Sequence, residues 1–297
     1  MLNGFANNAV VQQTVAEASA ALGQDLGALI AEGPKEALDL TTNTQPLMLT
    51  AGVAVYRAWI AAGGAVPAIV AGHSLGEYSA LVAAGVIDFA AAVPLVRLRA
   101  QAMQEAVPVG QGGMAAILGM SDADVIALCA DAAQGEVVEA VNFNAPAQVV
   151  IAGNKAAVER ACQLAKDRGA KRALPLPVSA PFHSSLLQPA SDRLREAMSA
   201  MQFNAPSVAL INNVDVAIVQ DANGIKDALV RQAARPVRWV EVVQAMAAHG
   251  VTHVVECGPG KVLMGLTKRI DGELTGEAIT DQASLERVLA LLNPTAA

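Results

Sequence analysis

Apolar positions along this chain follow two patterns that alternate from one segment to the next. In residues 8–31 they recur at spacings of three and four, which predicts a helix. An apolar run at 65–71 predicts a strand, and the Ala- and Leu-rich segment 77–86 predicts the helix after it. Strands that alternate with helices in this way indicate an α/β fold with a mostly parallel sheet.

The same patterns continue on both sides of this region. Gly33-Pro34 ends the first helix, and a second helix is predicted over 47–62. Asp88 opens another helix, in which Pro94 is expected to mark a restart because proline fits best in a first turn. Further helices are predicted over 187–201, 225–233, 239–248 and from 262, with strands over 208–212 and 253–256.

A Pro/Gly-rich linker at 107–113 precedes a segment with a different order of predicted strands and helices. Strands are predicted over 114–118, 137–141, 148–151 and 172–178, with a helix to 133 opened by Ser121 and one to 168 capped by Asn154. This β-α-β-β-α-β order is that of the ferredoxin-like unit. We therefore predict a larger α/β domain over 1–108 and 179–297, and a small inserted domain over 109–178.

Composition narrows the class of protein. The chain has 297 residues, a mean hydropathy of +0.40 and a net charge of −7, which disfavours a nucleic-acid partner. Three widely spaced cysteines (Cys129, Cys162 and Cys257) indicate reduced thiols rather than disulfides or a metal site. No apolar run is long enough to cross a membrane and no signal peptide is evident, so we expect a cytoplasmic protein.

The segment Gly72-His73-Ser74-Leu75-Gly76 lies between the predicted strand and its helix. Glycines at both ends permit a sharp bend and leave access to Ser74. The following helix directs free N–H groups at the serine, so the Leu75 N–H would stabilise an oxyanion formed there. This pattern is typical of a nucleophile elbow and predicts an acyl-serine intermediate.

A serine nucleophile needs a base, and the chain has only four histidines. His73 adjoins the serine and points elsewhere, His249 suits a helix end, and His253 is expected to be a buried core residue. His183 lies where the inserted segment returns to the larger domain, a place where clefts form. We therefore predict His183 as the base, although no aspartate stands where a hydrolase triad would need one.

Six motifs then occur in one order: Thr44-Gln45-Pro46, Gly72-His73-Ser74-Leu75-Gly76-Glu77-Tyr78, Arg99 with Met103-Gln104, Val141-Asn142-Phe143-Asn144, Pro181-Phe182-His183 and Glu256-Cys257-Gly258-Pro259-Gly260-Lys261. Together they resemble the malonyl-CoA:acyl-carrier-protein transacylases of bacterial fatty-acid synthesis. The resemblance implies an α/β-hydrolase-like domain with a ferredoxin-like insertion. It also implies malonyl transfer from malonyl-CoA to holo acyl carrier protein, without a cofactor.

The resemblance assigns roles to individual residues. It implies that Ser74 is the nucleophile, that His183 is the base, and that the main-chain carbonyl of Gln232 holds the histidine in place of an aspartate. Arg99 matches the arginine that grips the malonyl carboxylate, which suits a guanidinium because it binds carboxylates through two parallel hydrogen bonds. Arg97, two positions away on the helix, faces elsewhere and receives no role.

The remaining candidates have a second interpretation as structural residues. Phe182 resembles the malonyl-selective form of its loop, where a ring would crowd a branched substrate, and simple packing explains it equally well. Gln45, Asn142, Asn144 and Met114 are weaker pocket candidates. The basic cluster of Lys166, Arg168, Lys171 and Arg172 is either a solvated face or a surface for an acidic carrier protein. Gly258-Pro259-Gly260-Lys261 lacks the spacing of a phosphate loop and is interpreted as a tight turn.

One departure from the family's pattern bears on activity. The family begins with a strand that ends in Gly-Gln-Gly-Ser-Gln, which supplies a second oxyanion donor, and the present sequence starts after that point. From this we expect unpaired neighbouring strands, reduced stability and weak activity in the chain as written. Two alternative functions remain: a serine hydrolase or thioesterase on the same scaffold, and a non-catalytic binding remnant.

Overall fold

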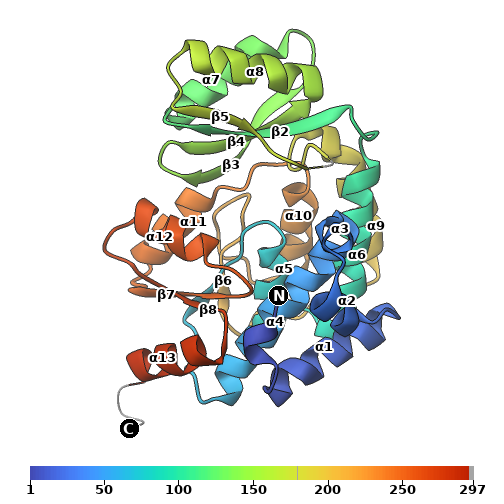
Figure 1. Ribbon diagram of the computed structural model, residues 1–297, viewed down its shortest axis with the longest axis vertical. Coiled ribbons are helices and arrows are strands. Elements are labelled where there is room, and N and C mark those ends of the chain that lie inside the picture. Colours follow the sequence, from blue (N-terminus) through green and yellow to red (C-terminus); the bar gives the residue numbers. More distant parts are fainter. Residues whose placement is uncertain (179, 294–297) are drawn as a thin grey trace. The chain divides into compact units, whose positions relative to one another are not determined.

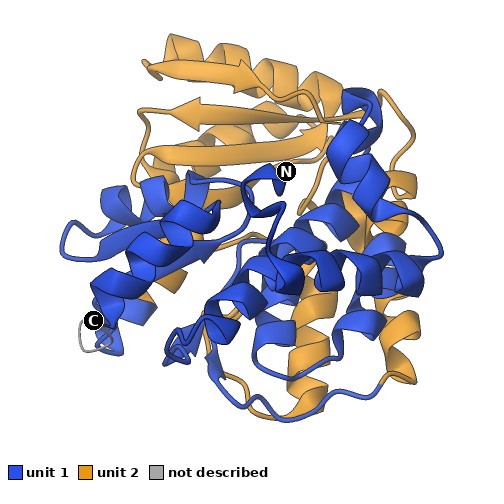
Figure 2. Ribbon diagram, turned by 60° about the horizontal axis from the view of Figure 1, so that its bottom comes forward, with its two compact units in different colours: residues 1–98, 202–211, 246–297 blue, residues 99–201, 212–245 orange. Residues whose placement is uncertain are grey.

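The computed structural model describes residues 1–178 and 180–293. The chain divides into two compact units, each built from segments that are distant in sequence (Figure 2). Unit 1 comprises Met1–Leu98, Gln202–Ile211 and Met246–Ala297, and unit 2 comprises Arg99–Met201 and Asn212–Ala245. Helices and strands alternate in both, so the fold is α/β, as the sequence predicts.

Unit 1 combines helices with two short pairs of parallel strands (Figure 1). Its helical elements are η1 (Asn3–Phe5), α1 (Ala9–Leu22), α2 (Leu26–Glu32), α3 (Lys35–Asp39), α4 (Thr41–Ala61), α5 (Gly76–Ala83), the first part of α6 (Phe89–Glu105), α12 (Val262–Ile270) and α13 (Gln282–Leu292). Its strands are β1 (Ile69–Val70), β6 (Ala209–Leu210), β7 (His253–Cys257) and β8 (Thr275–Ile279). Within the described residues β1 pairs only with β6, and β7 only with β8.

Helix α4 lies at the centre of unit 1. Its buried residues pack with residues of η1, α1 and α13 in one apolar cluster that includes Phe5, Val55 and Val288. A Cβ atom added at Gly52 would lie 3.2 Å from the Ser79 hydroxyl and 3.5 Å from the Cys257 carbonyl oxygen. Glycine at this position therefore lets α4 approach both α5, which follows the predicted serine turn, and the end of β7.

Three predictions for the helices of unit 1 are wrong in detail. The helix predicted over 8–31 is two helices, because Gly23 adopts a left-handed conformation (φ 64°) and Asp25 caps a new helix through its side chain. Pro46 lies inside α4 rather than ahead of it. Pro94 also lies inside a continuous α6, where the buried neighbours Val93 and Leu95 hold the helix together without a restart.

Unit 2 contains a four-stranded antiparallel sheet in the order β3-β4-β2-β5. Its elements are β2 (Gly112–Leu118), α7 (Asp122–Ala133), β3 (Val138–Ala145), β4 (Gln148–Asn154), α8 (Lys155–Asp167), β5 (Arg172–Pro175), η2 (Ser185–Leu187), α9 (Gln188–Ser199), α10 (Ala222–Gln232) and most of α11 (Trp239–Ala248). Helices α7 and α8 cover one face of the sheet (Figure 1), and an apolar cluster that includes Ile117, Leu128 and Ile151 fills the space between them.

Two predicted helix caps in unit 2 have different outcomes. Ser121 caps α7, since its hydroxyl accepts a hydrogen bond from the Asp124 N–H at 3.2 Å. Asn154 occupies the cap position of α8, but its side chain accepts from the Val137 N–H at 2.8 Å instead. The asparagine therefore ties the start of α8 to the strand region before β3, a contact that local sequence does not reveal.

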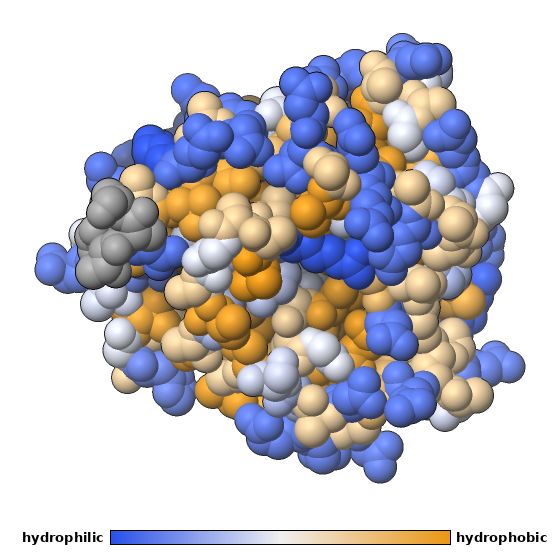
Figure 3. All heavy atoms as spheres, turned by 90° about the horizontal axis from the view of Figure 1, so that it is seen from below, coloured by the Kyte–Doolittle hydropathy of each residue, from blue (hydrophilic) through white to orange (hydrophobic). Residues whose placement is uncertain are grey.

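Apolar side chains also reach the surface. Figure 3 shows apolar side chains exposed among polar residues on one face. The large apolar residues that are exposed in the described chain include Leu40, Val66, Val109 and Val262. Some exposed apolar surface is normal for globular proteins, because polar residues cannot cover all of it. The positive mean hydropathy of the sequence therefore reflects both a large core and an apolar surface fraction.

Candidate active site

The predicted nucleophile lies on a sharp turn in unit 1. The turn connects β1 to α5, and Ser74 at its apex has a left-handed backbone (φ 52°), which is uncommon for a residue other than glycine. Hydrogen bonds from Gly76 N–H to His73 O (2.9 Å) and from Glu77 N–H to Ser74 O (3.1 Å) close the turn. Strand, strained serine and helix follow in the order that a nucleophile elbow requires.

The two glycines of this turn have different structural roles. A Cβ atom at Gly72 would lie 1.9 Å from the Gly76 carbonyl carbon and 2.5 Å from the Glu77 nitrogen, so no side chain fits there. A Cβ atom at Gly76 would meet nothing within 4 Å. Gly72 is thus required by the close approach of the backbone, whereas the absence of a side chain at Gly76 keeps the space at the helix start open.

The N-terminus of α5 supplies the predicted oxyanion donor. Leu75 is the residue before the helix, and among the described residues its N–H donates no hydrogen bond. The first N–H groups of a helix have no partner within the helix and lie at the positive end of its dipole. The Leu75 N–H is therefore available to an anion that forms at the serine.

The predicted base lies in unit 2, in a loop that several contacts clamp. His183 is 3% exposed and has a left-handed backbone (φ 66°). On one side, the ring of Pro181 lies against Gly112, where an added Cβ would come within 2.5 Å of it. On the other, the Ser185 N–H and hydroxyl both donate to the Glu139 carboxylate, at 2.7 and 2.8 Å. Contacts on both sides thus hold the segment that carries the histidine.

The main-chain carbonyl of Gln232 binds this histidine. Nδ1 of His183 lies 2.8 Å from the carbonyl oxygen, and because a carbonyl only accepts, Nδ1 must donate, which leaves Nε2 as the basic nitrogen. Gln232 is the last residue of α10, whose final carbonyls have no partner within the helix. These carbonyls carry the negative end of the helix dipole and would stabilise a protonated imidazole.

Arg99 lies in the same buried group. Its side chain is 2% exposed, and its Nη2 donates a hydrogen bond of 2.9 Å to the Gln232 side-chain oxygen. The side-chain nitrogen of Gln232 lies 3.5 Å from the Asn213 side-chain oxygen. Unit 2 therefore brings together Arg99, His183, Asn213 and Gln232, which we call the histidine cluster. The contribution of Asn213 was missed, because no pattern in the sequence marks it.

The weaker pocket candidates lie in different places. Met114 on β2 and Phe182 belong to one apolar cluster in unit 2, so the ring next to His183 packs on the sheet. Asn144 lies on β3 in the same unit. Gln45 is a buried residue of α4 in unit 1, where its side chain donates to the Thr41 hydroxyl at 3.4 Å.

Several other ionisable groups have structural surroundings. Arg97 donates to the side-chain oxygens of Gln24 (2.6 Å) and Asn43 (3.2 Å), which fits its lack of a predicted catalytic role. His253 is exposed, so the prediction that it is a core histidine is wrong. Burial raises the pKa of both the Cys129 and the Cys257 thiol to about 12, which makes neither a thiolate nucleophile near neutral pH.

The turn at residues 258–261 precedes a helix that is capped by a carboxylate. Glu256 accepts a hydrogen bond of 2.8 Å from the Met264 N–H in the first turn of α12. Its pKa is raised by burial, an effect that backbone N–H groups of α12 partly oppose. Since a carboxylate of the chain itself already occupies this helix N-terminus, the segment is a capped turn rather than a phosphate-binding loop.

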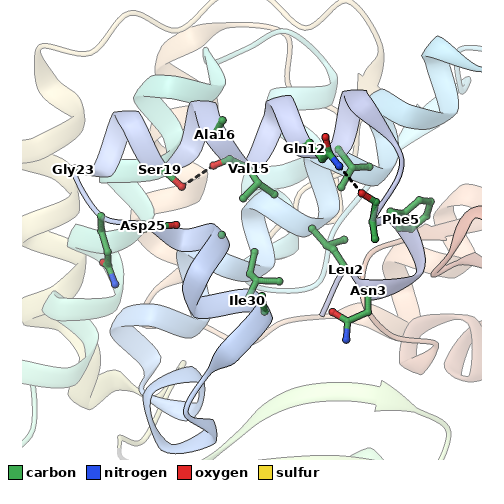
Figure 4. A pocket seen from close by; sticks show the side chains of 15 residues that line it. Leu2, Asn3, Phe5, Gln12, Val15, Ala16, Ser19, Gly23, Asp25 and Ile30 are labelled. Carbon is green, nitrogen blue, oxygen red and sulfur yellow. Dashed lines mark hydrogen bonds between the residues drawn. The ribbon is translucent and has the colours of Figure 1, made fainter.

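A groove of about 760 Å³ runs along α1 and α2 in unit 1. Apolar side chains such as Leu2, Val15 and Ile30 point into it (Figure 4). None of the predicted site residues lines this groove, so it is separate from the predicted chemistry. Among the described residues there is no cluster of three metal-binding side chains, and no helix is long and apolar enough to span a membrane.

Comparison with known proteins gives a consistent family. Residues 5–287 match the model of the acyl transferase domain. The malonyl CoA-acyl carrier protein transacylase of Escherichia coli K12 is 57% identical over 95% of this chain and 91% of its own length. The crystal structure of an acyl-carrier-protein S-malonyltransferase from Burkholderia pseudomallei is 69% identical, with a TM-score of 0.96 over 97% of this chain and 94% of that one.

A third relative was solved as a complex. It is a malonyl-transacylase bound to its type II PKS acyl-carrier protein, 50% identical to this chain, with a TM-score of 0.95 over 99% of this chain and 96% of that one. The identity is high, and the matches extend over nearly the whole of each partner. The chain is therefore an enzyme of the acyl transferase domain family, and it belongs to the malonyl CoA-acyl carrier protein transacylases.

Proposed function

We propose that this chain transfers a malonyl group from malonyl-CoA to the phosphopantetheine thiol of holo acyl carrier protein, through an acyl-serine at Ser74. The observation that carries the proposal is that one buried residue, Gln232, contacts both the predicted base and the predicted carboxylate-binding arginine. A base beside a buried cation suits an acyl group that reacts at one end and is anionic at the other.

In the first half-reaction the Ser74 hydroxyl attacks the thioester carbonyl. His183 Nε2 accepts the hydroxyl proton, and the Leu75 N–H stabilises the oxyanion of the tetrahedral intermediate. The intermediate collapses when the carbon–sulfur bond breaks, and the imidazolium returns the proton to the CoA thiolate. The product of this step is malonyl-Ser74 and free CoA.

The second half-reaction uses the same groups in reverse. The phosphopantetheine thiol of the carrier protein gives its proton to His183 and attacks the malonyl-serine ester. Collapse of the intermediate releases Ser74, which recovers the proton from the imidazolium. Because the chemistry is acyl exchange between a thiol and a hydroxyl, it needs no redox cofactor, and His183 is regenerated in each half.

Arg99 distinguishes this function from that of a hydrolase or thioesterase of neutral acyl groups. Burying a guanidinium is costly unless a ligand or the protein compensates for its charge, and an enzyme for uncharged acyl groups has no use for it. A malonyl group ends in a carboxylate that binds the guanidinium through charge-assisted hydrogen bonds. The position of Arg99 in the histidine cluster therefore favours the transferase over the hydrolase.

We further propose that the fold consists of a larger domain with a smaller domain inserted into it. Residues 1–108 and 179–297 would form the α/β-hydrolase-like domain and residues 109–178 the ferredoxin-like insertion. The order β3-β4-β2-β5, with α7 and α8 on one face, supports the second part. The serine turn between β1 and α5 supports the first part.

The carrier protein is the proposed second substrate. An acidic carrier would need a local basic surface, because this chain carries a net charge of −7. In the basic cluster named above, Arg168 forms an ion pair with Asp131, while Lys166, Lys171 and Arg172 form no ion pair with any described residue. These three cations support a docking surface for the carrier protein on the inserted domain.

The decisive experiment is mass spectrometry of the intact protein after incubation with malonyl-CoA, with Ser74→Ala as control. We expect a malonyl adduct on the wild type and none on the variant. Arg99→Ala should lower malonyl loading by about 100-fold, since it removes charge-assisted hydrogen bonds, and should spare loading from an acetyl thioester. The transferase proposal fails if the wild type forms no adduct, and the role of Arg99 fails if both acyl groups are lost equally.

A further inference from the structure

We propose that Gln232 is a positioning residue whose side-chain amide orients Arg99. This orientation determines the preference of the enzyme for acyl groups that end in a carboxylate. The inference rests on the proposed function and extends it. In the two half-reactions described above, Gln232 acts on His183 only through its main-chain carbonyl, which a residue with any side chain could supply. The contacts of the amide indicate a second, separate task.

The amide links two segments that are far apart in sequence. Its oxygen accepts from Arg99 Nη2 on α6 at 2.9 Å, and its nitrogen lies 3.5 Å from the Asn213 side-chain oxygen. Both Gln232 and Asn213 are fully buried, and the Asn213 carbonyl accepts from the Arg238 N–H at 3.2 Å, which fixes the asparagine backbone. The guanidinium is therefore oriented by a chain of buried hydrogen bonds.

The chemistry of the three side chains determines which atom donates and which accepts in each of these hydrogen bonds. A guanidinium has only donors, so the oxygen of the Gln232 amide must face it. The amide nitrogen, itself a donor, then faces the acceptor oxygen of Asn213. Each group is in the only orientation that satisfies both neighbours, and rotation of the Gln232 amide by 180° would place a donor against a donor.

A neutral amide suits this task better than a carboxylate would. It fixes one guanidinium nitrogen through a hydrogen bond without placing a negative charge beside Arg99. A glutamate at the same place would form an ion pair with Arg99 and compete with the carboxylate of the substrate. An amide is therefore the side chain that positions the cation without neutralising it.

The two tasks of Gln232 can be separated by substitution. A change of side chain leaves the main-chain carbonyl that holds His183 Nδ1, whereas it removes or alters the contact with Arg99. Gln232→Met keeps the volume and removes both polar atoms, and Gln232→Glu keeps the shape and adds a charge. The substitutions should therefore change the selectivity for malonyl over acetyl groups but leave proton transfer by His183 unchanged.

The test measures kcat/KM for acylation of Ser74 by malonyl-CoA and by acetyl-CoA, which lacks the carboxylate, together with the pH dependence of each. In Gln232→Met we expect kcat/KM for malonyl-CoA to fall by about tenfold or more, mainly through KM, as one buried hydrogen bond to a charged group is lost. The kcat/KM for acetyl-CoA should change by less than about threefold, and the midpoint of the pH dependence of acylation should stay the same. Gln232→Glu should lower malonyl loading further, and Asn213→Ala should lower it less.

Asn212→Ala is the matched control. It removes a neighbouring buried amide whose oxygen accepts from the Asp215 N–H at 2.7 Å, outside the hydrogen bonds that join Arg99, Gln232 and Asn213, so malonyl selectivity should be kept. The inference is overturned if Gln232→Met keeps its malonyl-to-acetyl ratio, or if both substrates and the pH midpoint change together, which would indicate a disturbed His183. Failure of the wild type to load malonyl would instead refute the proposed function.

Discussion

The serine turn and the histidine cluster are built in opposite ways. The turn consists of five consecutive residues, and the hydrogen bonds that close it join residues three positions apart. In the histidine cluster, the Arg99–Gln232 contact spans 133 positions, and the His183–Gln232 contact spans 49. One feature is specified by local backbone geometry, the other by the packing of separate segments of unit 2.

This difference predicts how each feature should fail. A local turn depends on the conformations that a few residues can adopt, so it is most sensitive to an added atom at a crowded position. A cluster of buried polar groups depends on mutual satisfaction, so removal of one member leaves others without partners and is costly. Substitutions at single positions can test both expectations.

The largest effect is expected from His183→Ala. Loss of the general base should lower the rate of Ser74 acylation by about 10³-fold, within the range typical of general acid–base catalysis. It also removes the partner of the Gln232 carbonyl in a fully buried place, so the melting temperature should fall. Rates of malonyl-serine formation by quenched mass spectrometry, with thermal melts, measure both.

The pH profile of the same variant provides a control. Without an imidazole, the serine can be deprotonated only by solvent or by hydroxide, so the residual rate should keep rising with pH. If the acylation rate of His183→Ala stayed within tenfold of the wild type, another group would be the base and the cluster would have a structural role only.

The next effect concerns the serine turn, through a matched pair of glycines. Gly72→Ala places a Cβ atom 1.9 Å from the Gly76 carbonyl carbon, so the backbone must move, at a cost of about 2 kcal/mol or more and with loss of malonyl loading. Gly76→Ala meets nothing within 4 Å and should change stability by about 0.5 kcal/mol or less. Thermal melts of both variants compare them directly. Equal destabilisation would show that the turn is not limited by crowding at Gly72.

The same distinction explains what the sequence could predict. The serine turn, the Ser121 cap and helices α7 and α11 were accessible because their determinants lie within a few residues. The β-α-β-β-α-β order followed from the alternation of patterns. The break at Gly23 was missed although its signal was present, because apolar spacing continues across it and outweighed the glycine in our interpretation.

Long-range contacts account for most of what could not be predicted. The Asn154 side chain bonds a residue 17 positions earlier rather than its own helix. Asn213 joins the histidine cluster through side-chain contacts that neither its neighbours nor its spacing reveal. Even His183 and Arg99 were placed by reasoning about loops and by family resemblance, because periodicity alone cannot identify which buried polar residues meet.

The contact of Glu256 with α12 is neither as local as the serine turn nor as long-range as the histidine cluster. The titration of this carboxylate gives the smallest predicted effect on the melting temperature. Glu256 reaches eight positions along the chain to cap α12, and burial raises its pKa above the ordinary value of 4.5. Because the folded state holds this proton more tightly than the unfolded state, stability should fall as pH rises through the window above 4.5. Glu256→Gln removes the titration, so its melting temperature relative to the wild type should be lowest near pH 4 and rise toward pH 7, by about 3 °C or less. Melts of both proteins at each pH isolate this group from the other carboxylates. If the melting temperature of the wild type instead rose relative to that of Glu256→Gln, the hydrogen bonds from the α12 N–H groups would outweigh burial. Glu256 would then be a satisfied polar group, as the members of the histidine cluster are.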